Sequence, residues 1–201
     1  MQRAIENQPW DLSTYCTKLQ RLRNEYAILE PSKTIFTGSG DSYSAALFAS
    51  ELTNGISQAF DPYELSKKSW LARGKHLVII SVSGKTKTNT ELATKLRRTA
   101  RAVVAVTSDL DSPLALKCDD TILLNHRREN VPTAGTSSYT SSLLVCGFLL
   151  GKLPKTLDVS KTLAKGLGLG EEESKAADPD VLHGYRIWVG PCGWLLWSAK
   201  V

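Results

Sequence analysis

Two short turns rich in serine and glycine hold the residues of this sequence that are best suited to chemistry. One is Gly38-Ser39-Gly40-Asp41-Ser42, and the other is Ser81-Val82-Ser83-Gly84-Lys85-Thr86. Their hydroxyls and free backbone amides are neutral donors that can surround a phosphate, and the positive end of a following helix dipole adds to that attraction. A single turn of this kind more often serves only to cap a helix, so the hypothesis of an anion site needs both turns to lie together.

The segments around the turns predict how they are positioned. Apolar runs indicate strands, and segments with helical spacing alternate with them. The expected strands are 34–37, 76–80, 102–106 and 120–124, and the expected helices are 11–29, 43–52, 89–99 and 138–150, with a short helical turn at 113–116. This alternation predicts βαβ units and therefore an α/β fold: a three-layer αβα, flavodoxin-like architecture whose parallel sheet is covered by helices on both faces. In such sheets ligands bind beyond the carboxyl ends of the strands, which is where both turns are expected.

The composition and the charge narrow the possible function classes. The 201 residues are 42% hydrophobic and 22% charged, and no apolar run approaches the roughly 20 residues of a membrane span. Because the N-terminus has no secretion core, we expect a cytoplasmic protein that makes no membrane contact. The net charge of +5 alone raises nucleic-acid binding as a hypothesis. We expect no nucleic-acid partner, since the basic cluster at 95–101 has no interleaved aromatic residues.

Motifs for metals and cofactors are missing from the sequence. The cysteines Cys16, Cys118, Cys146 and Cys192 lie far apart without CxxC spacing, so we expect neither a zinc site nor a disulfide framework. The first turn lacks the third glycine of a dinucleotide-binding fingerprint, and no P-loop motif occurs. We therefore expect neither a metal nor another cofactor.

The two turns also carry a resemblance to a known family. In order and spacing they are similar to the phosphate loops of the sugar-isomerase (SIS) family, and in particular to those in the isomerase portion of glucosamine-6-phosphate synthases. Ile5-Glu6-Asn7-Gln8-Pro9 resembles the signature that heads that portion, and Glu129-Asn130-Val131-Pro132-Thr133 leads into a Ser/Thr-rich helix start much as its third loop does. The resemblance covers roughly residues 1–150.

The resemblance implies a role for each residue that matches a motif. The phosphate of a sugar phosphate would be held by Ser42, Ser81, Ser83 and Thr86, and the sugar would be approached by Gly38, Ser39, Gly40 and Thr133. Val82 and Lys85 depart from the family's glutamine and glutamate, which removes one sugar contact and places a cation near the phosphate. Lys85 is either an aid to anion binding or an ordinary solvated lysine.

The resemblance also implies an incomplete domain organisation. Residues 1–153 are expected to form the phosphosugar-binding domain, 154–184 a linker, and 185–201 the start of a second SIS-like repeat. In the family, a glutaminase half precedes the first repeat, and the second repeat supplies residues for ring opening and proton transfer. We therefore expect no glutamine hydrolysis here. The chain's own candidates for acid–base chemistry are Glu129, His126 and His183, with Glu129 as the expected catalytic residue.

Two functions remain as hypotheses. The first is an enzyme of amino sugar metabolism: an aldose–ketose isomerase, or an aminosugar-phosphate isomerase or deaminase, acting on a ligand such as fructose 6-phosphate or glucosamine 6-phosphate. The second is a non-catalytic module that senses a sugar phosphate or regulates another protein. We expect the apolar tail with Trp188, Trp194 and 195–197 to pack on this domain or on another subunit, and family analogy favours a homodimer.

Overall fold

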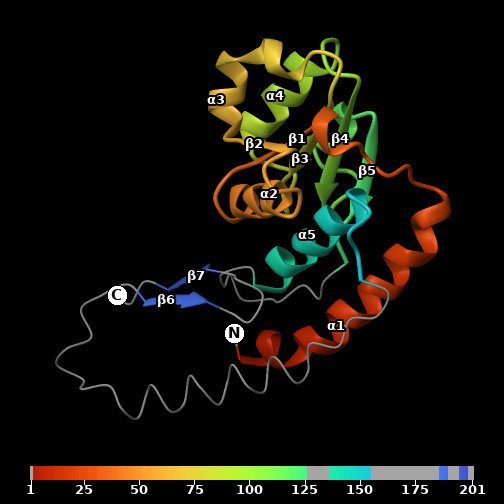
Figure 1. The fold of residues 1–201 in the computed structure, drawn as a ribbon, viewed down its shortest axis with the longest axis vertical. Helices are drawn as coiled ribbons and strands as arrows, with labels where there is room; N and C mark the ends of the chain where they lie inside the picture. Colours follow the sequence, from red (N-terminus) through yellow and green to blue (C-terminus); the bar gives the residue numbers. More distant parts are fainter. Residues whose placement is uncertain (1, 126–135, 155–185, 190–194, 199–201) are drawn as a thin grey trace. The chain divides into compact units, whose positions relative to one another are not determined.

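Five short strands form one parallel sheet, which helices of the same unit flank (Figure 1). The computed structural model describes residues 2–125, 136–154, 186–189 and 195–198, which belong to a larger unit, 1–157, and a smaller one, 158–201. The strands of the sheet are β1 (Thr34–Gly38), β2 (Gln58–Phe60), β3 (His76–Ile80), β4 (Ala102–Thr107) and β5 (Asp120–Leu123), and their order is β2-β1-β3-β4-β5. Every neighbouring pair is parallel. The parallel sheet that the sequence predicts is therefore confirmed.

Helices cover both faces of the sheet. They are α1 (Gln2–Arg21), α2 (Asp41–Glu51), α3 (Pro62–Lys67), α4 (Lys87–Leu96) and α5 (Thr136–Leu149), with short 3-10 turns at Leu22–Asn24, Pro31–Lys33, Ser69–Ala72 and Ala115–Lys117. Side chains of α1, α2 and α5 share one buried apolar cluster with Phe36 and Val78, whereas α3 and α4 share a second cluster with Ile35 and Leu77. Because successive residues of a strand point to opposite faces, the two clusters lie on the two sides of the sheet. The three-layer αβα architecture is confirmed.

The elements form where the sequence gives local signals for them. Leu77 to Ile80 in β3 are completely buried, as is typical of a parallel strand between two layers of helices. Helix α3 begins at a strong signal: the Asp61 carboxylate accepts a hydrogen bond from the Tyr63 amide at 2.8 Å, and Pro62 occupies the first helical turn. Apolar runs therefore place the strands, and caps place the helix starts.

Three elements differ from the sequence prediction. The apolar pattern indicates neither β2 nor α3, which have only three and six residues. The first helix begins at Gln2 and ends at Arg21, whereas the spacing predicts a helix over 11–29. Leu22 and Tyr26 still pack against the first apolar cluster after that helix has ended. Their spacing therefore reflects contact with the core rather than helical turns.

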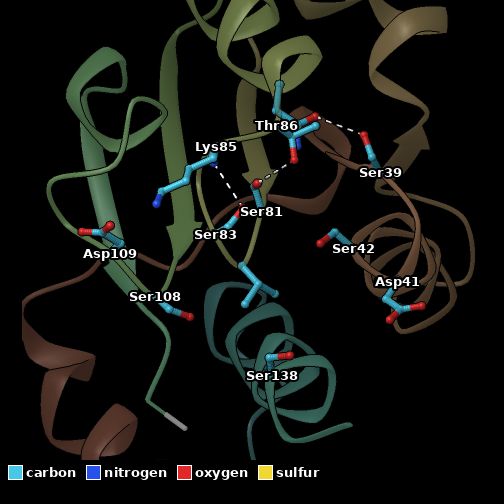
Figure 2. A pocket seen from close by; sticks show the side chains of 12 residues that line it. Ser39, Asp41, Ser42, Ser81, Ser83, Lys85, Thr86, Ser108, Asp109 and Ser138 are labelled. Carbon is cyan, nitrogen blue, oxygen red and sulfur yellow. Dashed lines mark hydrogen bonds between the residues drawn. The ribbon is translucent and has the colours of Figure 1, made fainter. Parts of the chain in front are cut away.

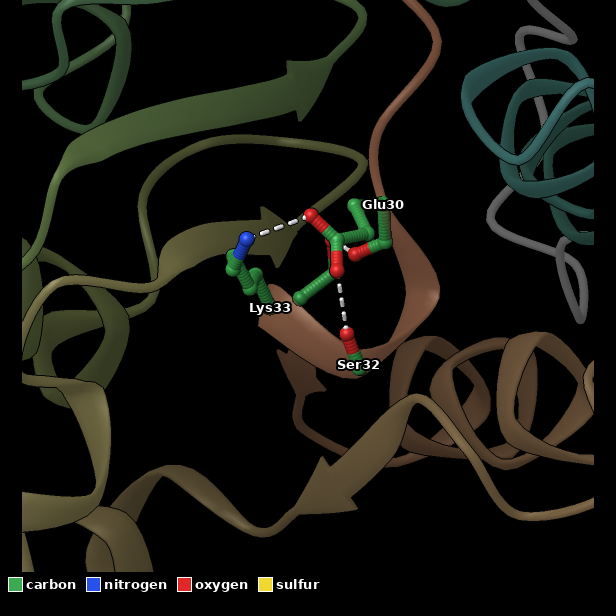
Figure 3. A network of polar contacts seen from close by, with 4 residues as sticks. Glu30, Ser32 and Lys33 are labelled. Carbon is green, nitrogen blue, oxygen red and sulfur yellow. Dashed lines mark hydrogen bonds and ion pairs between the residues drawn. The ribbon is translucent and has the colours of Figure 1, made fainter.

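A small polar network fixes the entry into β1 (Figure 3). The carboxylate of Glu30 accepts hydrogen bonds from Lys33 Nζ and from Ser32 Oγ, both at 2.7 Å. The hydrogen bond from Lys33, followed by the one from Ser32, lowers the pKa of Glu30. The carbonyl oxygen of Glu30 also accepts from Thr34 Oγ1 at 2.8 Å. These bonds hold the 3-10 turn from which the first strand starts.

The described residues of the smaller unit form two strands. β6 (Arg186–Val189) and β7 (Leu195–Ser198) pair antiparallel in a sheet of their own. β6 coincides with the strand that the sequence predicts after residue 185. That these residues begin a second SIS-like repeat stays a prediction, and the expected linker lies almost entirely outside the described residues.

The helices in the described ranges do not combine the length and the apolar character that crossing a lipid bilayer requires.

Candidate functional site

The strand order creates a place for a ligand between β1 and β3. From β1 the chain moves outward to β2, and it then returns to form β3 on the other side of β1. Open α/β sheets bind ligands at such a reversal, beyond the carboxyl ends of the strands. Gly38 at the end of β1 is paired with Ile80 at the end of β3, so the two Ser/Gly-rich turns begin side by side. The fold thus brings both turns to one edge of the sheet.

The first turn depends on two glycines for different reasons. A Cβ atom on Gly38 would lie 2.7 Å from Ser42 Cβ and 2.8 Å from the Ile80 carbonyl oxygen, so only glycine allows the start of α2 to approach β3. Gly40 has a φ of +60° and is the N-cap of α2. The resulting turn places Ser42, which is 9% exposed, in the first turn of α2.

The second turn is tied together by its own polar groups. The Gly84 amide donates to the Ser81 carbonyl oxygen at 2.9 Å, and the Lys85 amide donates to Ser83 Oγ at 3.3 Å. Ser81 Oγ lies 3.4 Å from Thr86 Oγ1. Thr86 is the N-cap of α4, but its hydroxyl makes no capping hydrogen bond to the helix. The first amides of α4 therefore have no side-chain cap, and a helix N-terminus in that state attracts an anion.

Both turns line one pocket of about 540 Å³ (Figure 2). Its lining residues are Ser39, Asp41, Ser42, Ser81, Val82, Ser83, Lys85, Thr86, Asn89, Ser108, Asp109 and Ser138. In Figure 2, Ser39 and Ser42 lie on one side of the hollow, and Ser83 and Lys85 lie on the other. The volume is within the roughly 300–1,000 Å³ of small-molecule sites. The pocket is therefore large enough for a small phosphorylated metabolite.

The structure brings several of the residues predicted from the sequence into this pocket. Five of them line it: Ser39, Ser42, Ser81, Ser83 and Thr86. Gly38 and Gly40 shape the first turn without lining the pocket. The candidates Thr133, Glu129, His126 and His183 lie outside the described residues. Their roles stay predictions.

Four lining residues were not indicated by the motifs. Ser108 and Asp109 directly follow β4, whose carboxyl end lies at the same edge of the sheet, so the rule that selects the first two turns also applies to them. Asn89 lies three residues after Thr86, in the first turn of α4. Ser138 lies in the first turn of α5, within the Ser/Thr-rich helix start that follows the predicted third loop, but no role of its own was predicted for it from the sequence.

The charged groups at the pocket have both signs. Lys85 is an exposed cation at the second turn, Asp41 is the first residue of α2, and Asp109 follows the end of β4. Tyr139, the neighbour of Ser138, has a raised pKa because burial disfavours its charged form, with a further contribution from the charge of Asp41. The pocket thus offers neutral hydroxyl donors, one cation and two carboxylates.

The cysteines that the structure describes do not line the pocket. Cys16, Cys118 and Cys146 are free and buried. Burial raises the pKa of the Cys118 thiol to about 12 and raises that of Cys146 as well, so both stay protonated and unreactive. In the part of the chain that the structure describes, no group of three or more His, Cys, Asp or Glu residues is arranged to hold a metal ion.

The profile of the SIS domain matches residues 27–151, which is more than half of the chain. This range contains the whole parallel sheet and both turns of the pocket. No curated protein matches the sequence significantly.

Three solved structures illustrate the similarity of fold. A provisionally assigned phosphosugar isomerase from Silicibacter pomeroyi is 23% identical, with a TM-score of 0.59 and coverage of 87% of this chain and 55% of that one. An Escherichia coli CFT073 protein in complex with a sugar phosphate is 19% identical, with a TM-score of 0.57 and coverage of 84% and 90%. The Vibrio vulnificus NanR protein complexed with ManNAc-6P is 16% identical, with a TM-score of 0.57 and coverage of 88% and 68%. This chain therefore spans about half the length of the first structure and most of the second.

Proposed function

Because this chain belongs to the SIS domain family, we propose that its pocket binds a sugar phosphate through the phosphate group. The observation that carries the proposal is the convergence of four hydroxyl side chains from two separate turns, Ser42, Ser81, Ser83 and Thr86, on one pocket. Hydroxyls that gather at the carboxyl edge of a parallel sheet, in front of two helix N-termini, match the chemistry of a phosphate monoester.

The proposed phosphate position lies in front of the starts of α2 and α4. Gly40 caps α2 and Thr86 caps α4, and neither cap uses a side-chain hydrogen bond. Each helix N-terminus carries a partial positive charge of about half a unit, which favours a dianion without any ion pair. Lys85 adds a full positive charge at the rim. Its exposure makes this contribution sensitive to salt.

The proposed ligand is a sugar phosphate such as fructose 6-phosphate or glucosamine 6-phosphate. The structurally similar E. coli and V. vulnificus proteins were each solved with a sugar phosphate, which is ManNAc-6P in the second, and this supports the ligand class. Ser39 lines the same pocket as the four side chains whose hydroxyls are proposed to hold the phosphate, and it is the first proposed contact to the sugar. A place in amino sugar metabolism, a homodimer and a cytoplasmic location belong to the same proposal.

Catalysis is the further part of the proposal. Isomerisation between an aldose and a ketose needs a base near C1 and C2 of the sugar. Glu129 is the base predicted from the sequence, and the carboxylates of Asp41 and Asp109 border the described pocket. An assay of isomerisation and of ammonia release, with fructose 6-phosphate and glucosamine 6-phosphate, separates an enzyme from a module that only binds. Turnover at the background rate, together with binding, would indicate the sensing or regulatory module.

Calorimetry on the whole chain tests the binding proposal. We expect micromolar binding of fructose 6-phosphate and at least tenfold weaker binding of fructose. Ser81→Ala or Ser83→Ala each removes one hydrogen bond to a charged group, which is worth about 1.5–3 kcal/mol and so lowers the affinity by roughly tenfold or more. Ser66→Ala is the matched control, because Ser66 is a half-buried serine of α3 that does not line the pocket. Equal affinity for fructose and fructose 6-phosphate would refute the proposal.

A further inference from the structure

The side chain of Asn89 connects the two turns of the pocket. It lies in the first turn of α4, lines the pocket, and is only 1% exposed. Its Oδ1 atom accepts a long hydrogen bond of 3.5 Å from Ser39 Oγ, which belongs to the turn after β1. A single buried amide therefore connects the second turn's helix to the first turn's serine.

The other polar atom of this amide is unsatisfied. Among the residues that the structure describes, Asn89 Nδ2 is the one buried side-chain nitrogen or oxygen without a hydrogen-bond partner. A buried donor without a partner is unfavourable, and native proteins keep very few of them. Such a group at a pocket wall points to a partner that arrives with a ligand.

Asn89 is a polar residue on a helix face that is otherwise apolar and buried. Leu92, Ala93 and Leu96 follow at helical spacing and are all completely or almost completely buried in the second apolar cluster. The residue at position 89 begins this same buried face, where the pattern calls for an apolar side chain. Local departures of this kind are expected at functional sites, where ligand contact outweighs the stability that is lost.

We propose that Asn89 is a specificity-determining residue that reads a hydroxyl of the sugar in the bound sugar phosphate, an inference that rests on the proposed function. Ser39 Oγ directs its hydrogen toward Asn89 Oδ1, which leaves the serine oxygen as an acceptor, while Nδ2 is a donor. A neighbouring donor and acceptor fit a hydroxyl group, which also donates and accepts. They do not fit a phosphate dianion, which only accepts.

This contact involves a rotation of the terminal amide of Asn89. The terminal torsion of an asparagine side chain has a broad energy well, so the amide can turn toward the pocket that it already borders. The phosphate would then be held by the second turn, and the sugar would be positioned between Ser39 and Asn89.

The test measures the binding of fructose 6-phosphate and of inorganic phosphate to the wild type and to Asn89→Leu. Leucine has the same branched heavy-atom skeleton as asparagine and continues the apolar face of α4. We expect roughly tenfold weaker binding of fructose 6-phosphate, and phosphate affinity within about twofold of the wild type. We also expect the urea midpoint of the ligand-free variant to equal or exceed that of the wild type, because an unsatisfied buried donor is removed. Asn89→Ala, which cannot clash, provides the same comparison if the leucine variant does not fold.

A second buried polar residue serves as the control. Thr53 is 5% exposed, does not line the pocket, and is fully engaged through Ser57, whose amide donates to Thr53 Oγ1 at 2.9 Å. Thr53→Val should lower the urea midpoint and leave both affinities unchanged. Unchanged binding of fructose 6-phosphate by Asn89→Leu, or an equal loss for both ligands, would overturn the assignment of Asn89 to the sugar. A wild type that binds neither ligand would overturn the proposed function, and this inference with it.

Discussion

Replacing Gly84 by alanine tests whether the second turn requires a glycine at this position. Gly84 has a φ of +62°, which costs an alanine about 1–2 kcal/mol. Its new Cβ atom would also overlap Ser112 Cβ and Oγ and lie 2.9 Å from Thr107 Oγ1. Overpacking of this kind costs about 1–3 kcal/mol. The two effects together predict a loss of about 2–5 kcal/mol, a large part of the roughly 5–15 kcal/mol that stabilises a typical domain.

Two other glycines separate the two causes. Gly74 has a φ of +70° but open space around the position of a Cβ atom, so Gly74→Ala should cost only the backbone term of about 1–2 kcal/mol. Gly38 has an ordinary φ, but its Cβ would lie 2.7 Å from Ser42 Cβ, so Gly38→Ala should cost only the packing term of about 1–3 kcal/mol. The three variants therefore measure the backbone cost, the packing cost and their sum.

Urea denaturation of the three variants and the wild type provides the measurement. With a slope of about 1–3 kcal/mol per M of urea, a loss of 3 kcal/mol moves the midpoint by about 1–3 M. We expect Gly84→Ala to be the least stable variant, with a loss close to the sum of the other two. If Gly84→Ala and Gly74→Ala lose the same free energy, the close contact with Ser112 is wrong, and so is the account of the turn.

Three further predictions follow from single side chains. Lys85→Ala should weaken sugar-phosphate binding by about threefold at low ionic strength, with no difference at about 0.5 M salt, and titrations at two salt concentrations check it. Burial, followed by the charge of Arg101, lowers the pKa of His76 below its ordinary value of 6.5. As the pH falls, the unfolded chain therefore binds a proton at this histidine before the folded chain does, and the free energy of unfolding should decrease below about pH 6.5. Urea midpoints measured across this pH range should show the decrease in the wild type and not in His76→Gln. Tyr15→Phe should destabilise the domain by about 1–3 kcal/mol in the same assay, because the Leu123 carbonyl loses the 2.8 Å hydrogen bond from Tyr15 Oη.

The sequence predicted the fold where local patterns suffice. β3 and β4 are uninterrupted apolar runs, and such runs are buried in parallel sheets, so their bounds were nearly right. β2 has three half-buried residues, too few to show any periodicity. The signal for α3 was present in Asp61-Pro62, an N-cap followed by a first-turn proline, although no apolar repeat accompanies it.

The sequence predicted the part of the site that residues close together in the chain form. It did not predict the part that long-range packing brings together. Ser81 and Thr86 belong to one short turn, so their small separation in the sequence is enough to predict that they lie close together. Asp109 joins them only because β4 lies beside β3, and Asn89, although it is near Thr86 in the chain, meets Ser39 only because β1 lies beside β3. Strand order is set by long-range packing. The resemblance to a family predicted which loops bind the ligand. It could not predict the site residues that lie outside the family's motifs.

Helix α4 has one end at the pocket and its remaining turns in the core, through Leu92 and Leu96. A ligand held at Thr86 therefore restrains an element whose unfolding would expose the second apolar cluster. Occupancy at a hundred times the dissociation constant raises the free energy of unfolding by about 2.7 kcal/mol. The physiological ligand can accordingly be sought by melting the protein in the presence of a panel of metabolites, before any reaction is known.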